Sequence, residues 1–341
     1  MSRIAILGAG SWGTALAVLL ARSRRSHELQ MWAHDPALAE SMQTERENRP
    51  YLPGQALPSL LRVRNDMARV LRDAEVVIGA MPSAHAREVY GAAIPLTPSS
   101  AVIVSATKGL EPSSHLRMTE VLGELRGPEQ GHQIAVLSGP SFAQEAARGE
   151  PTALVLAAKD ENLSAELQEE FAGPTLRLYT NMDVLGVELA GAMKNVIAIA
   201  AGACHGIGLG SNSLAALITR GLAEMTRLAV ALGARSETLS GLAGLGDLVL
   251  TCTGGLSRNR YVGVELGKGR QINGILAGMR MVAEGVGTTP ALLKLAGEAG
   301  VDLPITEQVN AILHEGKSPR DAIRDIMERP QKREAASVPR Q

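Results

Sequence analysis

The chain has 341 residues, of which 45% are hydrophobic and 20% are charged, and this length suits two folded domains better than one small core. A formal net charge of −1 and an aromatic content of 2% exclude the broad basic field and the stacking platforms of a nucleic-acid binder, so we expect no nucleic-acid partner. Cys204 and Cys252 lie far apart without zinc-ligand spacing, so we expect buried thiols, a cytoplasmic location and no metal.

The N-terminus combines a short apolar run, a glycine turn and a helical segment. Residues 4–7 predict a strand, Gly8-Ala-Gly10-Ser-Trp-Gly13 a tight turn, and residues 14–20 a helix. In such a turn Gly8 allows the sharp bend, Gly10 lets a phosphate approach the backbone, and Gly13 lets the helix pack close to the strand. The helix N-terminus then faces an anion with free N–H groups. We therefore expect a dinucleotide cofactor and redox chemistry.

Two other interpretations of this segment are an ordinary strand-to-helix turn and a secretory signal, because Arg3 precedes an apolar stretch that ends in small residues. However, residues 11–13 interrupt the apolar run, and a second strand pattern over residues 28–33 follows at the distance of a βαβ unit. Both features favour the dinucleotide interpretation.

Up to about Tyr179, short apolar runs alternate with helical stretches. This alternation predicts a doubly wound, mostly parallel sheet with helices on both faces, a Rossmann-like α/β domain over residues 1–186. The predicted strands are residues 4–7, 29–33, 76–80, 102–105, 134–137, 153–156 and 176–179.

Several of these strands lead directly into polar or glycine-containing turns, at residues 8–13, 34–35, 82–83, 107–109 and 138–141. The carboxyl ends of parallel strands lie on one edge of such a sheet, where ligands bind. We therefore expect these turns to meet around one site.

From about Val187, helical segments such as residues 214–232 and 291–299 replace the strand patterns, separated by glycine-rich breaks at residues 206–210 and 241–246. We expect an all-α domain over residues 187–328, packed on the first with the active site between them. A polar, disordered tail is expected over residues 329–341. Uninterrupted apolar segments stay shorter than the roughly 20 residues needed to span a bilayer, so no membrane span is expected.

Lys194 is the only cation in an apolar helical pattern over residues 188–202. The residues three or four positions away share its helix face, and none of them is a carboxylate. The ammonium thus has room beside it for a ligand. The alternative is a lysine that lays its stem along apolar surface and keeps its ammonium in water.

Asp247 lies among glycines and aliphatic residues, where a carboxylate needs a cation or several hydrogen-bond donors. Lys194 is one candidate partner, and capping of a helix start is the alternative. The following cluster Ser257-Arg258-Asn259-Arg260 suits a phosphate, which a guanidinium and neighbouring donors can bind. A solvated basic turn has the same composition.

Together these motifs resemble the bacterial NAD(P)-dependent glycerol-3-phosphate dehydrogenases, over nearly the whole chain and in the expected order. The segments that carry the resemblance are residues 8–15, 107–111, 138–143, 188–195, 244–247, 257–259 and 283–286.

The resemblance implies reversible hydride transfer between NAD(P)H and dihydroxyacetone phosphate, which gives sn-glycerol 3-phosphate for phospholipid synthesis. It also implies a homodimer, with Lys194 as the catalytic acid/base and Asp247 holding both Lys194 and the substrate. The implied substrate site consists of Lys108, Gly139, Ser141, Lys194, Asp247, Ser257, Arg258 and Asn259. The expected cofactor contacts include the three turn glycines, Gly8, Gly10 and Gly13. The resemblance adds Ser11, Trp12, His34, Lys108, Ala143, Arg258, Val282 and Glu284.

These roles fit the chemistry of the residues. The ammonium of Lys194 can stabilise the oxygen that gains charge as a carbonyl is reduced, and can donate a proton to it. In the reverse direction neutral Lys194 would take the alcohol proton, and the charge of Lys108 would lower the pKa of Lys194 toward that role.

The choice between NAD and NADP depends on the end of the second strand, where NAD-selective sites usually place Asp or Glu to bind the ribose 2′-hydroxyl. This chain has His34 there, followed by Asp35. His34 can pair with a 2′-phosphate, whereas Asp35 would repel one if it points inward, so we expect NADP or NAD, with NADPH favoured. The alternative functions are a related hydroxyacid or ketopantoate-type reductase of the same two-domain build and a non-catalytic dinucleotide-sensing protein.

Overall fold

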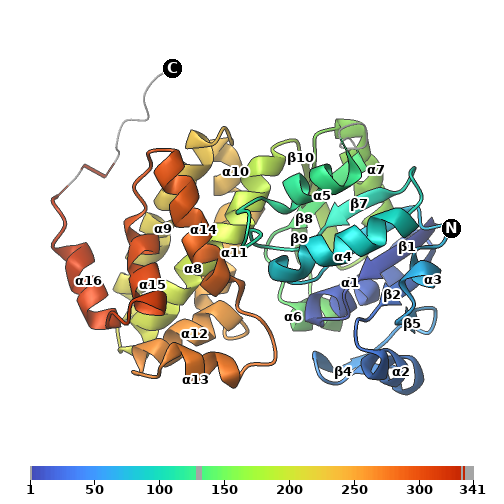
Figure 1. The fold of residues 1–341 in the computed structure, drawn as a ribbon, viewed down its shortest axis with the longest axis horizontal. Coiled ribbons are helices and arrows are strands. Elements are labelled where there is room, and N and C mark those ends of the chain that lie inside the picture. The colour runs from blue at the N-terminus through green and yellow to red at the C-terminus, as the bar shows by residue number, and fades with distance from the viewer. Residues whose placement is uncertain (1, 128–132, 332, 335–341) are drawn as a thin grey trace.

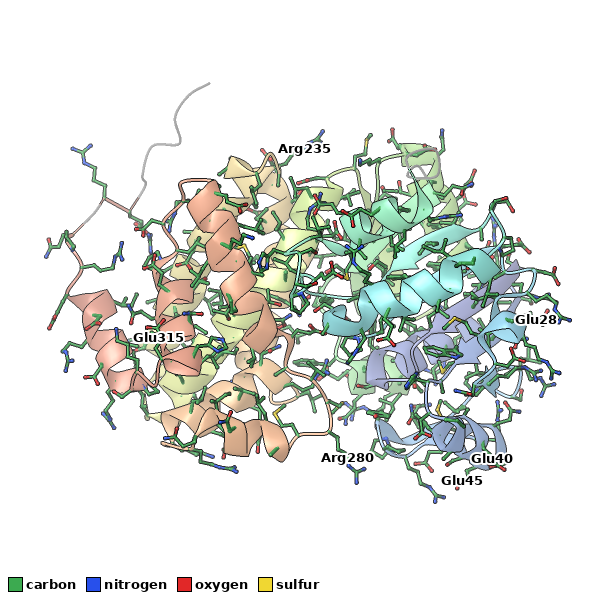
Figure 2. The ribbon with its side chains drawn as sticks, in the orientation of Figure 1. Glu28, Glu40, Glu45, Arg235, Arg280 and Glu315 are labelled. Atoms are coloured by element: carbon green, nitrogen blue, oxygen red, sulfur yellow. The ribbon has the colours of Figure 1, made fainter. Side chains whose placement is uncertain are left out.

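The computed structural model describes residues 2–127, 133–331 and 333–334, and it forms two packed units (Figure 1). One unit is a sheet with helices on both faces, and the other is a group of helices. Exposed charged side chains such as Glu40, Arg235 and Glu315 lie on the outer surface of both units (Figure 2). Of the predicted tail, residues 332 and 335–341 lie outside the described residues.

Within the described residues, the sheet has eight strands in the order β10-β9-β8-β7-β6-β1-β2-β5, which confirms the predicted Rossmann-like fold. The parallel strands are β1 (Ser2–Leu7), β2 (His27–Trp32), β5 (Arg62–Arg64), β6 (Val76–Gly79), β7 (Val102–Ser105) and β8 (Ile134–Ser138). A separate hairpin consists of β3 (Glu47–Asn48) and β4 (Leu52–Ala56). The sequence did not indicate β5 or this hairpin.

The last two strands of the sheet, β9 (Thr152–Ala158) and β10 (Leu176–Asn181), pair with each other in parallel but run opposite to β8. Between β8 and β9 the only helix is α6 (Ala143–Arg148). At a rise of 1.5 Å per residue it is about 9 Å long, which is too short to return the chain to the start of β8. The strand after it therefore runs in the opposite direction.

Alternating strand residues fill two apolar layers, as the period of two requires. Ile4 and Ile6 pack with Leu16 of α1 on one face, and Ala5 and Leu7 pack with Tyr90 of α4 on the other. The helices around the sheet are α1 (Ser11–Ala21), α2 (Pro36–Glu45), α3 (Met67–Leu71), α4 (Ala86–Ala93), α5 (Met118–Arg126), α6 and α7 (Glu161–Phe171). Both faces of the sheet are thus covered.

The helical unit is built around α8 (Val184–Gly206), whose side chains are almost all buried. By length and composition α8 could cross a membrane, but here it is the core helix of this unit. The predicted break at residues 241–246 is a π-helical turn, Leu242–Gly246, that continues into α11. The helices around α8 are α9 (Ser211–Ala231), α10 (Ser236–Ser240), α11 (Asp247–Thr253), α12 (Arg258–Gly267), α13 (Ile272–Ala277), α14 (Glu284–Glu298), α15 (Pro304–His314) and α16 (Pro319–Met327).

Helices α8 and α12 cross in close contact because glycines face each other at the crossing. A Cβ atom on Gly202 would lie 2.0 Å from the carbonyl oxygen of Arg260, and one on Gly263 would lie 2.0 Å from that of Ile199. No larger residue fits at either position without moving a helix. This crossing fixes the start of α12 relative to α8, which carries Lys194.

Candidate active site

The glycine turn after β1 has the geometry that its sequence predicts. Gly8 has a φ of 114°, which strongly favours glycine. A Cβ atom on Gly13 would lie 2.0 Å from the carbonyl oxygen of Gly8, whereas one on Gly10 would meet nothing within 4 Å. Gly10 precedes the first residue of α1, so open space lies where a phosphate would meet free N–H groups. The turn therefore fits a dinucleotide pyrophosphate.

Ser11 and Trp12, which begin α1, lie beside this turn. The Ser11 hydroxyl contacts the Met281 sulfur at 3.3 Å, across the boundary between the two units. Trp12 and Ala143 pack against one apolar cluster, and the buried indole Nε1 of Trp12 has no hydrogen-bond partner among the described residues. An orphaned buried donor at this edge is suited to a ligand.

The turn after β6 is held by the helical unit. Glu284, the first residue of α14, accepts hydrogen bonds from the backbone N of Ser83 at 3.0 Å and from its hydroxyl at 2.5 Å. A Cβ atom on Gly109 would lie within 3.1 Å of the Glu284 carboxylate, so the turns after β6 and β7 meet here. Burial raises the pKa of Glu284, and the bonds from Ser83 and the charge of Arg258 oppose this rise.

Two further predicted cofactor residues, Val282 and His34, lie on the surface. Val282, in the loop before α14, is 45% exposed. The adjoining Arg280 side chain also points into solvent (Figure 2). His34 follows β2 directly and is exposed.

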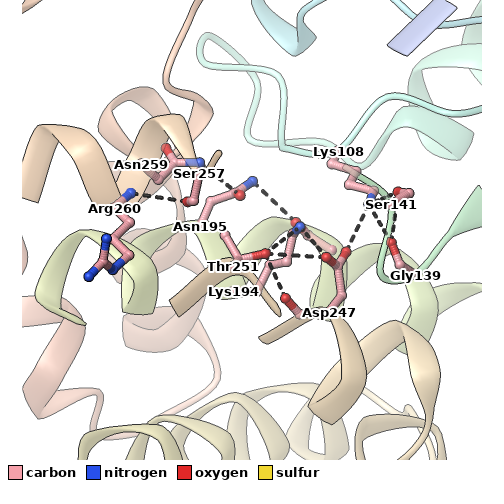
Figure 3. A network of polar contacts seen from close by, with 11 residues as sticks. Lys108, Gly139, Ser141, Lys194, Asn195, Asp247, Thr251, Ser257, Asn259 and Arg260 are labelled. Atoms are coloured by element: carbon pink, nitrogen blue, oxygen red, sulfur yellow. Dashed lines mark hydrogen bonds and ion pairs between the residues drawn. The ribbon is translucent and has the colours of Figure 1, made fainter. Parts of the chain in front are cut away.

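Lys194 and Asp247 form a buried ion pair at the boundary between the two units (Figure 3). Lys194 Nζ lies 2.6 Å from Asp247 Oδ1 and 3.0 Å from Thr251 Oγ1. Lys194 is 6% exposed and Asp247 is 1% exposed. The alternative of a lysine with its ammonium in water is therefore wrong, and the Asp247 carboxylate binds lysines instead of capping α11.

Lys108, from the turn after β7, approaches the same carboxylate from the sheet. Its Nζ lies 2.8 Å from Asp247 Oδ2, 2.8 Å from the carbonyl oxygen of Gly139 and 3.2 Å from Ser141 Oγ. These three acceptors use all three N–H bonds of the Lys108 ammonium. The turns after β7 and β8 thus meet each other, as the sequence predicted, and they also meet α11 there.

Burial and the neighbouring charges together set the pKa values of Lys194 and Asp247. Burial lowers the pKa of Lys194 to about 8, with a further lowering by the charge of Lys108, while Asp247 opposes both. Burial alone would raise the pKa of Asp247, but the charges of Lys108 and Lys194 hold it below its usual range. Lys194 can therefore gain and lose a proton near neutral pH beside a carboxylate that stays charged.

The Lys194 ammonium keeps one N–H bond free of the described residues, because only Asp247 and Thr251 accept from it. Gly191, one helical turn earlier on α8, lets this helix lie close to the end of β8 near Lys194. A Cβ atom on Gly191 would lie 3.0 Å from Ser138 Oγ, and this hydroxyl is itself buried without a hydrogen-bond partner in the described residues. A small polar substrate can thus meet donors from both units here.

The start of α12 supplies the remaining predicted substrate residues. Ser257 caps this helix by accepting from the Arg260 N at 3.1 Å, and Arg258 is exposed beside it. These two residues line a pocket of about 240 Å³ whose lining is Gly255, Leu256, Ser257, Arg258, Tyr261, Met279, Arg280 and Met281. Two of the lining residues are arginines, which suits an anion.

Asn259 differs from this expectation because its amide is used inside the helical unit. Its Nδ2 donates to Asn195 Oδ1 at 2.9 Å, and its Oδ1 accepts from Gly285 N at 2.9 Å. Asn259 thus links α8, α12 and the start of α14. Its partner on α8 is Asn195, the residue that follows Lys194.

Sequence reasoning did not identify three residues of this site: Thr251, Asn195 and Ser83. Thr251 lies four residues after Asp247, so the two residues share a helix face. This spacing was the signal from which Thr251 could have been predicted. Ser83 lies in the turn at residues 82–83 that we expected near the site, and Asn195 ends the segment 188–195 that carries the family resemblance. Neither residue was given a role, because their partners are 201 and 64 residues away, respectively.

Comparison with known proteins extends over both units. The model described as the NAD-dependent glycerol-3-phosphate dehydrogenase N-terminus matches residues 3–164, and the one described as its C-terminus matches residues 183–324. The chain is 55% identical to the NAD(P)+ glycerol-3-phosphate dehydrogenase of Koribacter versatilis over 331 residues, which cover 97% of this chain and 98% of that protein. It is also 55% identical to that of Acidobacterium capsulatum over 338 residues, covering 97% and 99%.

Solved structures agree. The crystal structure of glycerol-3-phosphate dehydrogenase from Coxiella burnetii has a TM-score of 0.90 at 41% identity, covering 96% of this chain and 99% of that one. A ketopantoate reductase from Ralstonia eutropha has a TM-score of 0.60 at 16% identity, covering 94% and 99%, and shares the fold alone.

Proposed function

The chain belongs to the NAD-dependent glycerol-3-phosphate dehydrogenase family, and on that premise we propose that it interconverts dihydroxyacetone phosphate and sn-glycerol 3-phosphate with NAD(P)H or NAD(P)+. The observation that carries the proposal is the buried Lys194 ammonium, held by Asp247 at the edge of the sheet where the glycine turn lies. A lysine with a pKa of about 8 in this position is suited to a reversible ketone–alcohol conversion.

When bound, the nicotinamide supplies or accepts the hydride at C2 of the substrate. Lys194 uses its remaining N–H bond to bind the C2 oxygen, stabilises the charge that develops there and donates a proton to it. In the oxidation, the neutral amine of Lys194 takes the proton from the alcohol. Asp247 keeps the Lys194 nitrogen in place through the 2.6 Å bond. Thr251 accepts a second N–H bond of the ammonium and so fixes its orientation.

The phosphate of the substrate, in this proposal, is bound from the start of α12. Arg258 supplies the charge, and Ser257 supports it from the same pocket. The Asn259 amide is already used by Asn195 and Gly285, so Asn259 holds Arg258 in position and does not bind the phosphate with its side chain. Lys108, Gly139 and Ser141 form the opposite wall of the site.

The cofactor, in the same proposal, lies along the carboxyl edge of the sheet. Gly8, Gly10 and Gly13 admit the pyrophosphate, and Ser11 and Trp12 offer donors beside it. Ala143 packs against the same apolar cluster as Trp12, and Glu284, Val282 and Arg258 would contact the coenzyme from the helical unit. His34 lies at the adenosine side.

The experiment that tests the function follows NADPH absorbance after addition of dihydroxyacetone phosphate, in parallel with dihydroxyacetone and ketopantoate. We expect rapid consumption of NADPH with the phosphorylated substrate alone. NADPH that binds but is not consumed with any substrate would identify a non-catalytic sensing protein, and equal consumption with ketopantoate would identify a reductase of another specificity.

We further propose that the chain acts in the cytoplasm as a homodimer, and that its domains meet next to residues 186 and 187, within the first turn of α8 (Val184–Gly206). The family resemblance supports the dimer, as do half-buried apolar side chains on α9, among them Leu214, Leu217 and Ile218. Two unpaired cysteines support the reducing compartment. Light scattering should give about twice the chain mass of 35.8 kDa, and a mass near 35.8 kDa at all concentrations would contradict the dimer.

A further inference from the structure

The glycine turn after β1 is bound by Asn48, a residue of the β3–β4 hairpin that the reaction above does not use. Asn48 Nδ2 donates to the carbonyl oxygen of Ala9 at 2.9 Å and to Thr14 Oγ1 at 2.7 Å. The Thr14 hydroxyl donates in turn to the carbonyl oxygen of Gly10 at 2.8 Å. Ala9 and Gly10 lie in the turn, and Thr14 lies in the first turn of α1. One amide group therefore holds the turn and the helix start together.

These bonds set the direction of the peptide group between Ala9 and Gly10. The peptide bonds of the described residues are trans, and in a trans peptide the C=O and the N–H point in opposite directions. Because the Ala9 carbonyl points to Asn48, the Gly10 N–H points away from Asn48. No residue that the structure describes accepts from this N–H, and the space at Gly10 is open. The Gly10 N–H is therefore available to an anion.

The hairpin that carries Asn48 is fixed on α1 by its own contacts. Leu52 of β4 packs with Val18 of α1 in one buried cluster. Glu47 Oε1 accepts from Gly54 N at 2.8 Å and ties the two strands of the hairpin together. Asn48 thus reaches the turn from a rigid support.

The surroundings of Asn48 argue against a role in packing alone. Its side chain is fully buried, and its Oδ1 has no hydrogen-bond partner among the described residues. Burying an amide with an unpaired oxygen costs free energy, and an apolar side chain would fill the space without that cost. The Ala9 carbonyl can only accept, so a donor is needed at this place to hold it. What Asn48 adds over an apolar residue is the orientation of the turn.

We propose that Asn48 is a positioning residue for the coenzyme, whose amide holds Ala9 and Thr14 so that the free N–H groups of the turn face the pyrophosphate. Asn48 acts through the turn and not on the reacting atoms. The inference rests on the proposed function only in needing a dinucleotide at this turn. The sequence gave no signal for it, because Asn48 and Ala9 are 39 residues apart.

Calorimetry with the full chain tests the proposal, with NADPH and NADH as probes. Asn48→Asp keeps the size of the side chain and replaces the donor by a carboxylate oxygen, which repels the Ala9 carbonyl. At a pH of about 8 we expect this variant to bind both coenzymes roughly 10-fold more weakly, and by the same factor, because both carry the pyrophosphate. At a pH of about 6 part of the affinity should return, since burial raises the pKa of the introduced carboxyl group and its protonated form can donate to Ala9.

Thr14→Val is the second variant, because it keeps the shape of threonine and removes the hydroxyl that links Asn48 to Gly10. It should weaken both coenzymes in the same way, and Thr14→Ser should keep most of the affinity. Leu167→Ala is the matched control for lost stability, because Leu167 of α7 lies in the buried core of the sheet unit. It should lower the unfolding midpoint and leave coenzyme binding within about twofold.

Steady-state kinetics separate positioning of the coenzyme from a general loss of structure. In Asn48→Asp, KM for the coenzyme should rise as its dissociation constant does, while kcat and KM for dihydroxyacetone phosphate stay within about twofold at saturating coenzyme.

Coenzyme affinities of Asn48→Asp and Thr14→Val equal to that of Leu167→Ala would overturn the proposal. A loss of affinity for NADPH alone would overturn it as well, because that loss would concern the 2′-phosphate. If Asn48→Asp does not fold, the two Thr14 variants decide between these outcomes. An unchanged chain that binds both coenzymes but does not reduce dihydroxyacetone phosphate would contradict the proposed function alone.

Discussion

At the scale of single residues, the charge state of Lys194 decides the direction in which the site works. Its pKa is lowered to about 8 by burial and by Lys108, and Asp247 limits that lowering. Protonated Lys194 is needed to reduce the ketone and neutral Lys194 to oxidise the alcohol. The two directions should therefore depend on pH with opposite sign.

We expect kcat for reduction to fall as pH rises through about 8, and kcat for oxidation to rise through the same range. Asp247→Asn removes the charge that raises the pKa of Lys194, so both transitions should move to lower pH. Steady-state rates between pH 6 and about 10 measure this. Profiles of the same sign in both directions would assign the titration to another group.

Arg258 should recognise the phosphate and take no part in proton transfer. Loss of a charge-assisted contact costs on the order of 1.5–3 kcal/mol, so Arg258→Ala should raise KM for dihydroxyacetone phosphate roughly 10- to 100-fold. The rate with unphosphorylated dihydroxyacetone, which we expect to be low from the outset, should change little. Steady-state kinetics with both ketones measure this effect. Equal losses of activity with the two ketones would show that Arg258 does not recognise the phosphate.

At the scale of helices and strands, the contact between α8 and α12 determines where Arg258 lies relative to Lys194. The glycines at this crossing leave no space for a methyl group. Overpacking of this kind costs about 1–3 kcal/mol and displaces backbone. The helices would then separate, and the phosphate site would move away from the amine.

Gly202→Ala should therefore lower the free energy of unfolding by about 1–3 kcal/mol and reduce kcat/KM. Gly274→Ala on α13 is the control, because a Cβ atom there meets nothing within 4 Å, and it should leave both quantities nearly unchanged. Denaturant unfolding and steady-state kinetics provide the comparison. A Gly202 variant as stable and active as the Gly274 variant would show that the close crossing is not required.

The same elements show how far the sequence could predict the structure. The strand-turn-helix at Gly8 to Gly13 was predictable because the glycines and the apolar runs act locally. The π-helical turn at residues 242–246 was not predictable, since glycines also mark breaks. The direction of β9 was also missed, because apolar periodicity carries no direction, and β5 has only Val63 as an apolar residue.

The site, like the fold, was predictable where the sequence signal is local. Asp247 stands out as a carboxylate among apolar neighbours, which requires a partner, and Lys194 stands out as a cation in an apolar helix. The bond from Lys108 to Asp247 joins residues 139 positions apart. That bond depends on how the two units dock, which no local pattern encodes.

At the scale of the whole molecule, buried ionic contacts fix the helical unit on the sheet. Besides the Lys108–Asp247 and Glu284–Ser83 contacts, Glu188 of α8 lies 2.8 Å from an Arg117 nitrogen and accepts from Thr119 N at 2.9 Å. Burial raises the pKa of Glu188, and Arg117 and Thr119 oppose this rise. Glu188 of the helical unit binds Arg117 and Thr119 of the sheet unit, so its role is to hold the two units together.

Glu188→Gln should lower the free energy of unfolding by about 1–3 kcal/mol, because it leaves the Arg117 charge without its buried partner. Glu298→Gln, at an exposed position on α14, is the control and should have little effect. The pH dependence of kcat should stay unchanged in both variants. A shifted pH profile in Glu188→Gln would show that Glu188 also sets the charge of the site.

The central claim is that docking of the helical unit places the Lys194 amine where the substrate meets the coenzyme. The most direct test compares Lys194→Ala with Lys294→Ala, an exposed lysine on α14, in NADPH binding and in turnover of dihydroxyacetone phosphate. Loss of the general acid should reduce kcat in Lys194→Ala by roughly 100- to 10,000-fold, while both variants bind NADPH as the unchanged chain does. Turnover by Lys194→Ala close to that of Lys294→Ala would contradict the account.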